Sequence, residues 1–279
     1  MSSIPSSQWT VRIVAAAFAV ALGAPTFAAD CKPAVADADL IKPGTLVMST
    51  NPTLPPLQFV DSSGALKGMR IELGTEIAKR LCLTPEFIRI EFSAMVPGLQ
   101  SGRWDMIDTG IFFTAERAKI MQMIPYEQQA ISVSVPLAAK GTINKPEDLA
   151  GKTVGVEIGG FEAAKTKVLN DELTAKGLTP MTVRTFDNFA LAYQALKAGQ
   201  VDAVVSIDGV AKAYADRGDF ARGVSGLFPT PVALAVKSKP LAEAVLKVLN
   251  EMKADGGYQK LFSAYGVSAP EGALAISGP

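Results

Sequence analysis

The stretch that decides the fold is Gly98–Tyr126, which reads GLQSGRWDMIDTGIFFTAERAKIMQMIPY. Its first residues complete a helix that we predict to end over Val96–Ser101, and a Gly-Arg turn follows. A short apolar strand is predicted at Asp105–Phe112. The strand leads directly into a second helix, for which Thr114 is a suitable N-cap because its hydroxyl can accept an otherwise unpaired N–H. The stretch therefore predicts a helix, a strand and a helix in close succession.

Arg117 falls in the first turn of that second helix. The N-terminal end of a helix carries partial positive charge, so a cation there is mildly unfavourable unless an anion lies nearby. The guanidinium and the first-turn N–H groups together form a suitable site for a carboxylate. The alternative is a solvated surface arginine, or one that pairs with Glu116 or Asp108. Local chemistry leaves both interpretations open.

The same stretch resembles the bacterial extracellular solute-binding family 3, the solute-binding proteins of ABC-type amino-acid importers. The pattern of that family reads roughly A-L-Q-x-G-x-x-D-x-x-x-x-G-x-x-x-T-x-x-R, followed by an apolar strand and P-Y. The positions in register are Leu99, Gln100, Gly102, Asp105, Gly110, Thr114, Arg117, Pro125 and Tyr126. In that family the arginine binds the α-carboxylate of the ligand. The resemblance therefore implies this role for Arg117.

Two further segments resemble the same family, so the resemblance covers essentially the whole mature chain. One is the phrase ALKAGQVDAVVS. The other lies at Gly68–Leu83, where the family signature runs G-aromatic-acid-apolar-acid-apolar. The fitting positions are Gly68, Ile71, Glu72 and Leu73. Met69 and Arg70 depart from the signature, which puts the local ion pairing in question more than the fold.

Residues 1–28 have the features of a cleaved secretory signal. Arg12 is the positive end, and the apolar core Ile13–Leu22 is shorter than the roughly 20 residues that a membrane span needs. Small residues in Thr26–Ala28 suit cleavage before Ala29, whereas a membrane anchor is the alternative. An acidic residue directly before Cys31 argues against a lipid anchor. We therefore expect export to the periplasm and a mature chain of 279 − 28 = 251 residues.

The composition is that of a globular protein, with 48% hydrophobic and 19% charged residues. Lys and Arg together number 27, as do Asp and Glu, and no basic stripe stands out. We therefore expect no nucleic-acid partner. The chain has no His and only two Cys, so we expect no metal site and no cofactor.

The two cysteines, Cys31 and Cys82, can pair in an exported protein. A bridge would close a loop of 82 − 31 = 51 residues and hold the N-terminal segment against the fold. The chain-entropy description gives such a loop roughly 4 kcal/mol of stabilisation. Two buried or free thiols are the alternative.

Strands and helices alternate along the mature chain, which predicts an α/β protein with mixed, mostly parallel sheets of βαβ units. Predicted strands are Thr45–Thr50, Glu86–Ser93, Ala130–Ala138, Gly151–Ile158, Thr182–Phe186, Val201–Ile207 and Leu227–Val236. Predicted helices are the later part of Gly68–Leu83, then Phe161–Lys176, Phe189–Ala198 with Asp187 as its cap, Leu241–Lys253 and Tyr258–Tyr265. Ligands bind beyond the carboxyl ends of strands in such sheets. Residues at such ends are Asn51, Phe92, Gly110, Gly159 and Asp208.

The resemblance implies the architecture as well, a two-lobed periplasmic-binding-protein fold of type II that closes about a hinge over its ligand. Lobe one would comprise residues 29–127 and 233–279, and lobe two residues 128–232. The chain would cross between the lobes near Tyr126–Ala130 and Thr230–Leu234. The implied partners are a small-molecule carboxylate ligand and the membrane permease of an ABC transporter, and we expect a monomer.

By the same resemblance, one wall of the cleft is formed by five residues of lobe one. Asn51 stands where many relatives have an Asp for the α-ammonium group, and Leu54 stands where many have an aromatic cover. Phe92 matches an aromatic wall, and Gly110 would offer a backbone carbonyl. Phe112 stands where relatives often place a hydroxyl residue. The carboxylate clamp therefore looks intact, while the ammonium clamp looks eroded.

Lobe two would contribute the opposite wall. Gly159 and Gly160 open the helix at Phe161, so an anion contact there must come from main-chain N–H groups; a plain tight turn is the alternative. Asp208 lies near the family's ammonium-binding Asp, one residue beyond the strict match. Glu157 is the alternative counter-charge.

Three classes of function fit these features. The first is a binding protein without a catalytic residue, whose ligand is an apolar or aromatic amino acid or a related small carboxylic acid. The second is an enzyme of the cyclohexadienyl or arogenate dehydratase type on the same fold, with Glu157 or Asp208 as the acid. The third is a sensory input module. The absence of His and of a second catalytic constellation favours the binding protein over the enzyme.

Overall fold

Strand β1 (Thr45–Thr50) lies at the centre of one half of a nine-stranded sheet and is buried on both faces. It pairs in parallel with β5 (Thr84–Arg89) and with β6 (Met106–Phe112). A strand covered on both sides needs a continuous apolar run, which explains why this segment is recognisable in the sequence. The computed structural model describes residues 31–279, and the expected signal segment at 1–28 lies outside them.

The spatial order of the large sheet is β5-β1-β6-β12-β7-β10-β8-β9, with β11 beside β7. Its remaining strands are β7 (Gln122–Val135), β8 (Thr153–Glu157), β9 (Thr182–Phe186), β10 (Ala203–Ile207), β11 (Ala221–Arg222) and β12 (Leu227–Val236). A second, antiparallel sheet has three short strands, β2 (Thr53–Leu54), β3 (Gln58–Val60) and β4 (Leu66–Lys67). The large sheet is mixed: its parallel pairs lie toward the two ends, and β12 and β7 pair antiparallel in the middle.

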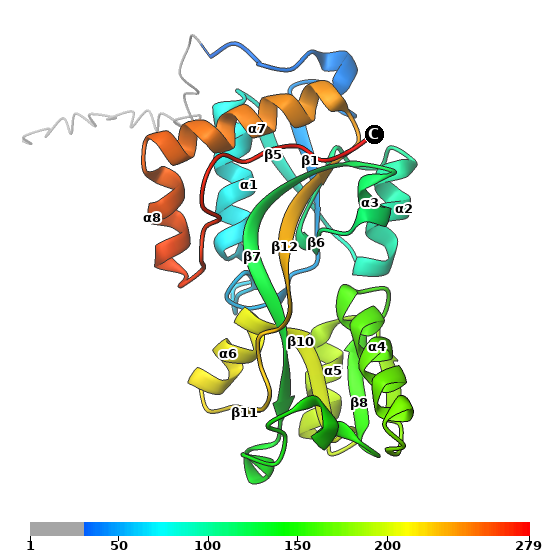
Figure 1. Ribbon diagram of the computed structural model, residues 1–279. Helices are drawn as coiled ribbons and strands as arrows, with labels where there is room; N and C mark the ends of the chain where they lie inside the picture. The colour runs from blue at the N-terminus through cyan, green and yellow to red at the C-terminus, as the bar shows by residue number, and fades with distance from the viewer. Residues whose placement is uncertain (1–30) are drawn as a thin grey trace, which may run out of the picture. The chain divides into compact units, whose positions relative to one another are not determined.

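Helices cover this sheet at both ends (Figure 1). They are α1 (Met69–Arg80), α2 (Met95–Gln100), α3 (Ala115–Ala118), α4 (Phe161–Ala175), α5 (Phe189–Lys197), α6 (Asp208–Asp216), α7 (Lys239–Ala254) and α8 (Gly257–Ala264). Short 3-10 turns lie at Asp37–Asp39, Phe92–Ala94, Leu137–Ala139 and Pro146–Leu149. Within the described residues, none of the helices has the length and hydropathy of a membrane span. The alternation of strands and helices confirms the predicted α/β fold.

Strand β7 is longer than the sequence indicates, because it begins at Gln122 and not near Ala130. Pro125 lies inside it although proline lacks a backbone N–H. The pairing with β12 shifts register beside Pro125, between Val232 and Ala233. Such an irregularity lets a proline lie within a paired strand.

Both expected chain crossings lie inside long strands, Tyr126–Ala130 in β7 and Thr230–Leu234 in β12. Figure 1 shows these two strands running between the end of the molecule that carries α1, α7 and α8 and the end that carries α4, α5 and α6. The two segments pair with each other, Thr230 with Gln129. The lobe boundaries themselves stay a prediction.

The opening stretch folds largely as predicted. Thr114 caps α3 by accepting the Arg117 N–H at 3.2 Å, although α3 has only four residues. Gly98 lies against the buried Trp104, and a Cβ at this glycine would be only 2.0 Å from the indole ring. The absence of a side chain at Gly98 therefore allows α2 to pack closely on the tryptophan.

Two local features differ from the sequence-based prediction. Asn188, and not Asp187, caps α5, because the Asn188 side chain accepts the Leu191 N–H at 3.0 Å. Helix α6 is an additional element that the sequence pattern does not predict. It begins directly at Asp208 without a turn after β10, so the sequence offers no separate start signal.

Cys31 and Cys82 are both disulfide-bonded, which confirms the predicted bridge. Cys82 follows the C-cap of α1 and has a φ of 60°, in the left-handed region.

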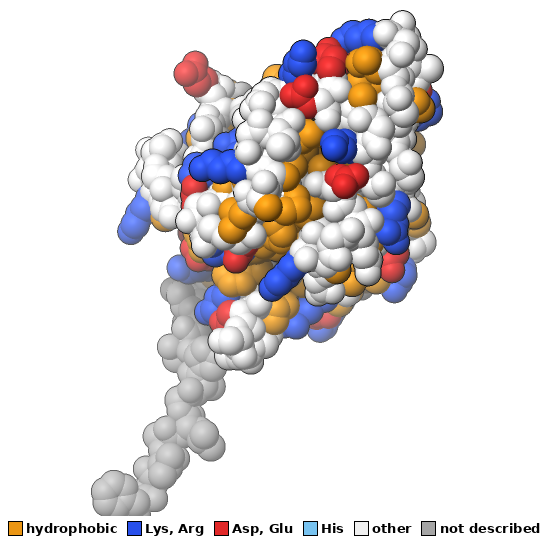
Figure 2. Space-filling model, turned by 90° about the horizontal axis from the view of Figure 1, so that it is seen from below, with side chains coloured by type: hydrophobic (Ala, Val, Ile, Leu, Met, Phe, Trp, Pro, Cys, Tyr) orange, Lys and Arg blue, Asp and Glu red, His pale blue; other side chains and the backbone are white. Residues whose placement is uncertain are grey.

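The surface of the protein carries charges of both signs. On the face shown in Figure 2, basic and acidic side chains are interspersed around an apolar area. This mixture agrees with the balanced charges of the sequence.

Candidate functional site

Side chains from several strand ends meet beside α3 and the start of α4. Asn51 follows β1, Phe92 begins the 3-10 turn after β5, and Phe112 ends β6. From the other end of the sheet come Glu157, the last residue of β8, and Phe161, the first residue of α4. We call this group, with Arg117, the cleft cluster. Asn51, Phe112 and Glu157 lie at the carboxyl ends of strands, where ligands bind in sheets of this kind.

Arg117 is half-buried, and its guanidinium meets backbone oxygens. Nη1 donates to the Phe112 carbonyl oxygen at 2.8 Å, and Nη2 to the Gly159 carbonyl oxygen at 3.5 Å. The guanidinium also lies over the Phe92 ring, 5.4 Å from its centroid. Burial lowers the pKa of Arg117, an effect that the charge of Glu162 partly offsets. Glu116, one of the alternative partners, pairs with Lys119 instead.

Aromatic rings form the apolar part of the cleft cluster. Phe112 and Phe161 stack with ring centroids 4.5 Å apart, which joins the end of β6 to the start of α4. Both rings are almost fully buried, and Phe92 lies under Arg117. Leu54, the expected cover, is buried in the main hydrophobic core. Of the three rings, the half-buried Phe92 leaves part of its apolar surface exposed.

A row of hydrogen bonds runs across the cleft cluster. Asn51 Nδ2 donates to Glu157 Oε1 at 2.9 Å and, over a longer 3.5 Å, to Glu91 Oε2. Glu91 Oε1 accepts from Asn188 Nδ2 at 3.0 Å. Sequence reasoning names Asn51 and Glu157 but misses Glu91 and Asn188. The adjacency of Glu91 to Phe92 is the only signal that the sequence offers.

Two buried carboxyl groups lie on the α4 side of the cluster. Burial raises the pKa of Glu157 well above its ordinary value, and the nearby charges of Glu162 and Glu91 act in the same direction. Burial also raises the pKa of Glu162 to about 7, against the attraction of Arg117. A cation bound between these groups would relieve their mutual repulsion. Among the described residues, no group of three or more acidic or cysteine side chains is arranged to hold a metal ion.

The two glycines before α4 differ in their surroundings. Gly159 has a φ of +75°, which favours glycine, and supplies the carbonyl oxygen that accepts from Arg117. Gly160 is the N-cap of α4, and a Cβ there would lie 2.7 Å from Glu162 Oε2. Gly159 therefore contributes its carbonyl group to the cluster, and Gly160 leaves room for the buried carboxyl.

Asp208 lies apart from the cleft cluster in its contacts. It pairs with Arg222 and accepts a hydrogen bond from Ser132. It also lines a cavity of about 220 Å³ together with Gln129 and Gly209. The structure therefore brings Glu157, and not Asp208, next to Asn51.

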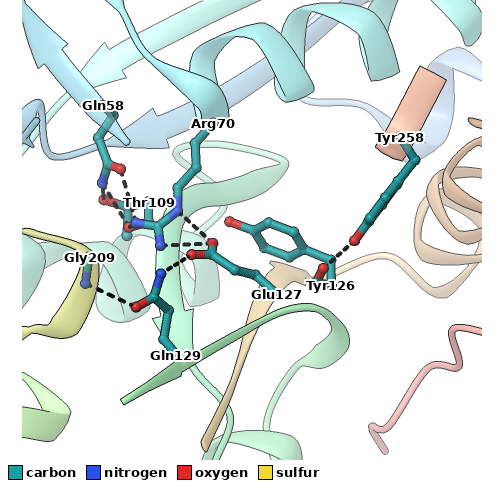
Figure 3. A network of polar contacts seen from close by, with 8 residues as sticks. All are labelled: Gln58, Arg70, Thr109, Tyr126, Glu127, Gln129, Gly209 and Tyr258. Atoms are coloured by element: carbon teal, nitrogen blue, oxygen red, sulfur yellow. Dashed lines mark hydrogen bonds and ion pairs between the residues drawn. The ribbon is translucent and has the colours of Figure 1, made fainter. Parts of the chain in front are cut away.

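Gly110 belongs to a second polar group, at the crossing of the strands (Figure 3). Its φ is +77°, and a Cβ there would lie only 2.0 Å from Arg70 Cζ. Arg70 is fully buried, and its Nε and Nη2 both donate to Glu127 Oε2, at 3.1 and 2.9 Å. Nη1 donates to Gln58 Oε1 and to the Thr109 carbonyl oxygen. We call this group the crossing network.

The crossing network extends along β7 toward α6. Gln129 donates to the second oxygen of Glu127 and accepts from the Gly209 N–H at 3.3 Å. Tyr258 of α8 donates to the Tyr126 carbonyl oxygen. Figure 3 shows how Arg70 reaches from α1 to the strand that carries Glu127. Arg70, which departs from the family signature, thus pairs with Glu127 of the same chain.

Comparison with known proteins places the chain in one family. Residues 46–268 match bacterial extracellular solute-binding proteins, family 3. The chain is 30% identical over 228 residues to the L-cystine-binding protein TcyJ of Escherichia coli (strain K12), covering 78% of this chain and 81% of that protein. It is also 30% identical to the lysine/arginine/ornithine-binding periplasmic protein of the same strain, covering 80% and 88%.

A solved structure agrees with these relatives. An ancestral arginine-binding protein bound to glutamine superposes with a TM-score of 0.72 and 36% identity, covering 80% of this chain and 97% of that one. The match confirms the predicted fold of type II periplasmic binding proteins. The relatives are described as binding proteins, in agreement with the expectation of a binding protein and not an enzyme. The chain therefore belongs to the bacterial extracellular solute-binding proteins of family 3.

Proposed function

We propose that the mature chain is the substrate-binding subunit of an ABC importer and binds a free amino acid between two lobes, residues 29–127 with 233–279 and residues 128–232. Names of relatives support an amino-acid ligand, since they bind L-cystine or lysine, arginine and ornithine. Hinge closure would bring Arg117 and Phe161 together on the ligand. The ligand would then be released to a membrane permease.

One observation carries the proposal: the guanidinium of Arg117 is half-buried and donates to carbonyl oxygens in the described part of the chain. A carbonyl oxygen carries no formal charge, so within residues 31–279 this guanidinium has no anionic side chain in direct contact. The 3.5 Å contact to Gly159 is long for an N–H···O bond. An α-carboxylate that replaced the Gly159 carbonyl oxygen as acceptor would form charge-assisted, bidentate hydrogen bonds with the guanidinium.

Glu157 supplies the counter-charge for the α-ammonium group in this proposal. It ends β8 on the α4 side of the cluster and has only the amide of Asn51 as a hydrogen-bond donor among the described residues. In this proposal Glu157, on the opposite wall, takes the role of the Asp that the resemblance implies for many relatives at position 51. A zwitterionic amino acid therefore fits better than an acid without an ammonium group.

The side chain of the ligand would lie against Phe92, Phe112 and Phe161, so we propose an apolar or aromatic amino acid. One observation favours a second candidate, a cationic amino acid. The charges of Glu162 and Glu91 both raise the pKa of Glu157, and Arg117 is the cation whose charge acts on Glu162 most strongly. A ligand with an additional positive charge would neutralise this excess of acid groups.

Export to the periplasm is part of the proposal. The signal features at residues 1–28 lie outside the described residues, but a similar protein is named as periplasmic. An oxidising compartment also suits the disulfide-bonded Cys31 and Cys82. Cleavage is checked by mass spectrometry of the exported protein, which we expect to begin at Ala29.

The test is a thermal-shift panel on refolded mature protein, since refolding removes any ligand that purification retains. The panel contains L-phenylalanine, L-leucine, L-cystine, L-arginine, and phenylpropionate, which lacks the ammonium group. A ligand at a hundredfold excess over its dissociation constant should stabilise the protein by about 2.7 kcal/mol. We expect L-phenylalanine or L-leucine to act and phenylpropionate to fail, whereas L-arginine alone would select the second candidate.

Arg117→Ala decides whether the guanidinium is responsible. We expect the shift to disappear in this variant, because charge-assisted hydrogen bonds contribute about 1.5–3 kcal/mol each. Arg103→Ala is the matched control, since Arg103 is exposed and its guanidinium contacts only the Trp104 ring among the interactions described. A shift that survives in Arg117→Ala would overturn the carboxylate clamp.

A further inference from the structure

Four side chains alternate donor and acceptor across the cleft cluster: Asn188, Glu91, Asn51 and Glu157. The three bonds between them run from Asn188 Nδ2 to Glu91, from Asn51 Nδ2 to Glu91, and from Asn51 Nδ2 to Glu157. We call this set the Asn–Glu relay. Two of its members follow β1 and β5, while the other two lie at the end of β8 and at the N-cap of α5. The relay therefore joins elements from the two ends of the large sheet.

The orientation of each amide in the relay is fixed by a second contact. Asn51 Oδ1 accepts from the Thr53 hydroxyl at 3.0 Å, so its two N–H groups must face the carboxylates. Asn188 Oδ1 accepts the Leu191 N–H as the cap of α5, so its Nδ2 must face Glu91. An amide can bridge two carboxylates because it has two donors. An Asp at position 51 would instead place three carboxylates together.

We infer that Asn188 and Glu91 are positioning residues: their hydrogen bond holds the two walls of the cleft together and, through Asn51, orients Glu157 toward the ligand. This inference rests on the proposed function, in which Glu157 binds the ammonium group. Neither Asn188 nor Glu91 needs to touch the ligand. Their hydrogen bond stabilises the closed arrangement of the two walls. Less of the binding free energy of a ligand is then used to close the cleft.

The relay also gives a physical reason for the asparagine at position 51. A relative with an ionised Asp at this position would have no side-chain N–H donor there, because a carboxylate only accepts hydrogen bonds. In this chain the acid lies at Glu157 on the other wall, and the donor lies at Asn51. Asn51 therefore donates to the carboxylate of Glu157, at 2.9 Å.

The test is an exchange of donor and acceptor. Asn188→Asp keeps the cap of α5, since Asp and Asn cap equally well, but places a carboxylate against Glu91. Glu91→Gln keeps one acceptor and loses the second. In the double variant, the new amide at position 91 can donate to the new carboxylate at position 188 and accept from Asn51. Every bond of the relay is then restored, with the first one reversed.

A matched control separates the relay from a general loss of charge on the same segment. Glu86→Gln serves this purpose, because Glu86 is also on β5 but pairs with Lys42 on the surface. The substitution removes the same carboxylate charge as Glu91→Gln. It leaves the contacts of the relay in place, so it should leave both the shape of the protein and its affinity unchanged.

Two measurements are made on each refolded variant. Small-angle scattering without ligand reports the radius of gyration, and calorimetry reports the dissociation constants of L-phenylalanine and L-arginine. We expect Asn188→Asp to increase the radius of gyration and to weaken binding about tenfold, from loss of one bond and gain of one repulsion. Glu91→Gln should weaken binding about threefold. The double variant should return to within about twofold of the original protein.

Three results would overturn the inference. The first is an Asn188→Asp variant with unchanged scattering and affinity. The second is a double variant that binds as weakly as its weaker parent, because that would show no direct coupling between the two side chains. The third is an equal effect of Glu86→Gln. If neither amino acid binds any variant, the proposed function fails, and the ligand-free scattering alone still decides whether the bond holds the walls together.

Discussion

Two arginines in this protein, the fully buried Arg70 and the half-buried Arg117, differ in what surrounds the charge. Arg70 is fully buried and makes two bonds to Glu127 and further bonds to Gln58 and Thr109. Burial by itself would lower the pKa of Arg70, but the charge and hydrogen bond of Glu127, together with the charges of Tyr126 and Asp108, outweigh it and raise the pKa. Arg117 has carbonyl oxygens as acceptors, and burial lowers its pKa. The crossing network thus contains the anion that pairs with Arg70. In the cleft cluster, a ligand would supply the anion that pairs with Arg117.

The acidic groups of the two regions differ in the same way. Glu127 receives donors on both oxygens, from Arg70 and from Gln129. Glu157 receives an amide donor, and its charged neighbours are other carboxyl groups. Fully satisfied ion pairs hold a fold in one arrangement, whereas incompletely neutralised groups favour binding. The contrast leads to three predictions.

The largest effect is expected from Glu127→Ala. It leaves the Arg70 guanidinium buried without its anion, which should lower the free energy of unfolding by about 3 to 5 kcal/mol. Urea denaturation of ligand-free protein measures this loss. Glu86→Ala is the control, because the exposed Lys42–Glu86 pair contributes at most about 1 kcal/mol.

A double variant sharpens this prediction. Replacing Arg70 by Met and Glu127 by Leu removes both charges together, so it should recover a large part of the stability lost in Glu127→Ala. If Glu127→Ala is as stable as Glu86→Ala, the Arg70–Glu127 pair does not stabilise the fold, and the contrast between the crossing network and the cleft cluster fails.

Gly110→Ala and Gly159→Ala are the next test. Both glycines have a positive φ, +77° and +75°, so both alanines incur about 1–2 kcal/mol of backbone strain. Only at Gly110 would the new Cβ meet a buried side chain, at 2.0 Å from Arg70 Cζ, whereas at Gly159 the nearest atoms are 3.8 Å away. We expect Gly110→Ala to be about 1–3 kcal/mol less stable than Gly159→Ala in urea. Equal losses would show that Arg70 moves aside without cost.

The smallest effect concerns pH and Glu162. Its pKa is about 7 in the folded protein and 4.5 ordinarily, so the folded state holds this proton more tightly. The resulting stability is fully present below about pH 4.5 and is lost as the pH rises through about 7. Ligand-free protein should therefore lose about 1–3 kcal/mol of unfolding free energy between about pH 5 and about pH 8.

Glu162→Gln should remove the share of this pH dependence that Glu162 contributes, since an amide does not titrate, while the raised pKa values of Glu157 and Asp108 keep a dependence of the same sign. Glu116→Gln is the control, because Glu116 is exposed and pairs with Lys119. A stability profile that is the same in Glu162→Gln as in the original protein would contradict the assignment. The original protein should also bind a cationic or zwitterionic ligand more tightly at about pH 8 than at about pH 5, because Glu162, with a pKa of about 7, is then ionised.

Much of the fold follows from local patterns in the sequence. The apolar run Thr45–Thr50 forms a buried parallel strand with the predicted bounds, and Thr114 forms a helix cap. Arg117 is recognisable from an ordered set of neighbours along the same stretch. These features depend on contacts within a few residues, or on a spacing that the chain itself displays. The disulfide follows from there being only two cysteines.

Only the tertiary structure decided which distant side chains meet. Arg70 and Glu127 are 57 positions apart, and Asn51 and Glu157 are 106 apart. Asp208 is a reasonable counter-charge by position, yet it lies against Arg222. The sequence by itself determined most of the elements, the family pattern and the arginine. The partners of each charge depend on how β7 and β12 bring the two ends of the sheet together, because hydrogen bonds and ion pairs form only within a few ångströms.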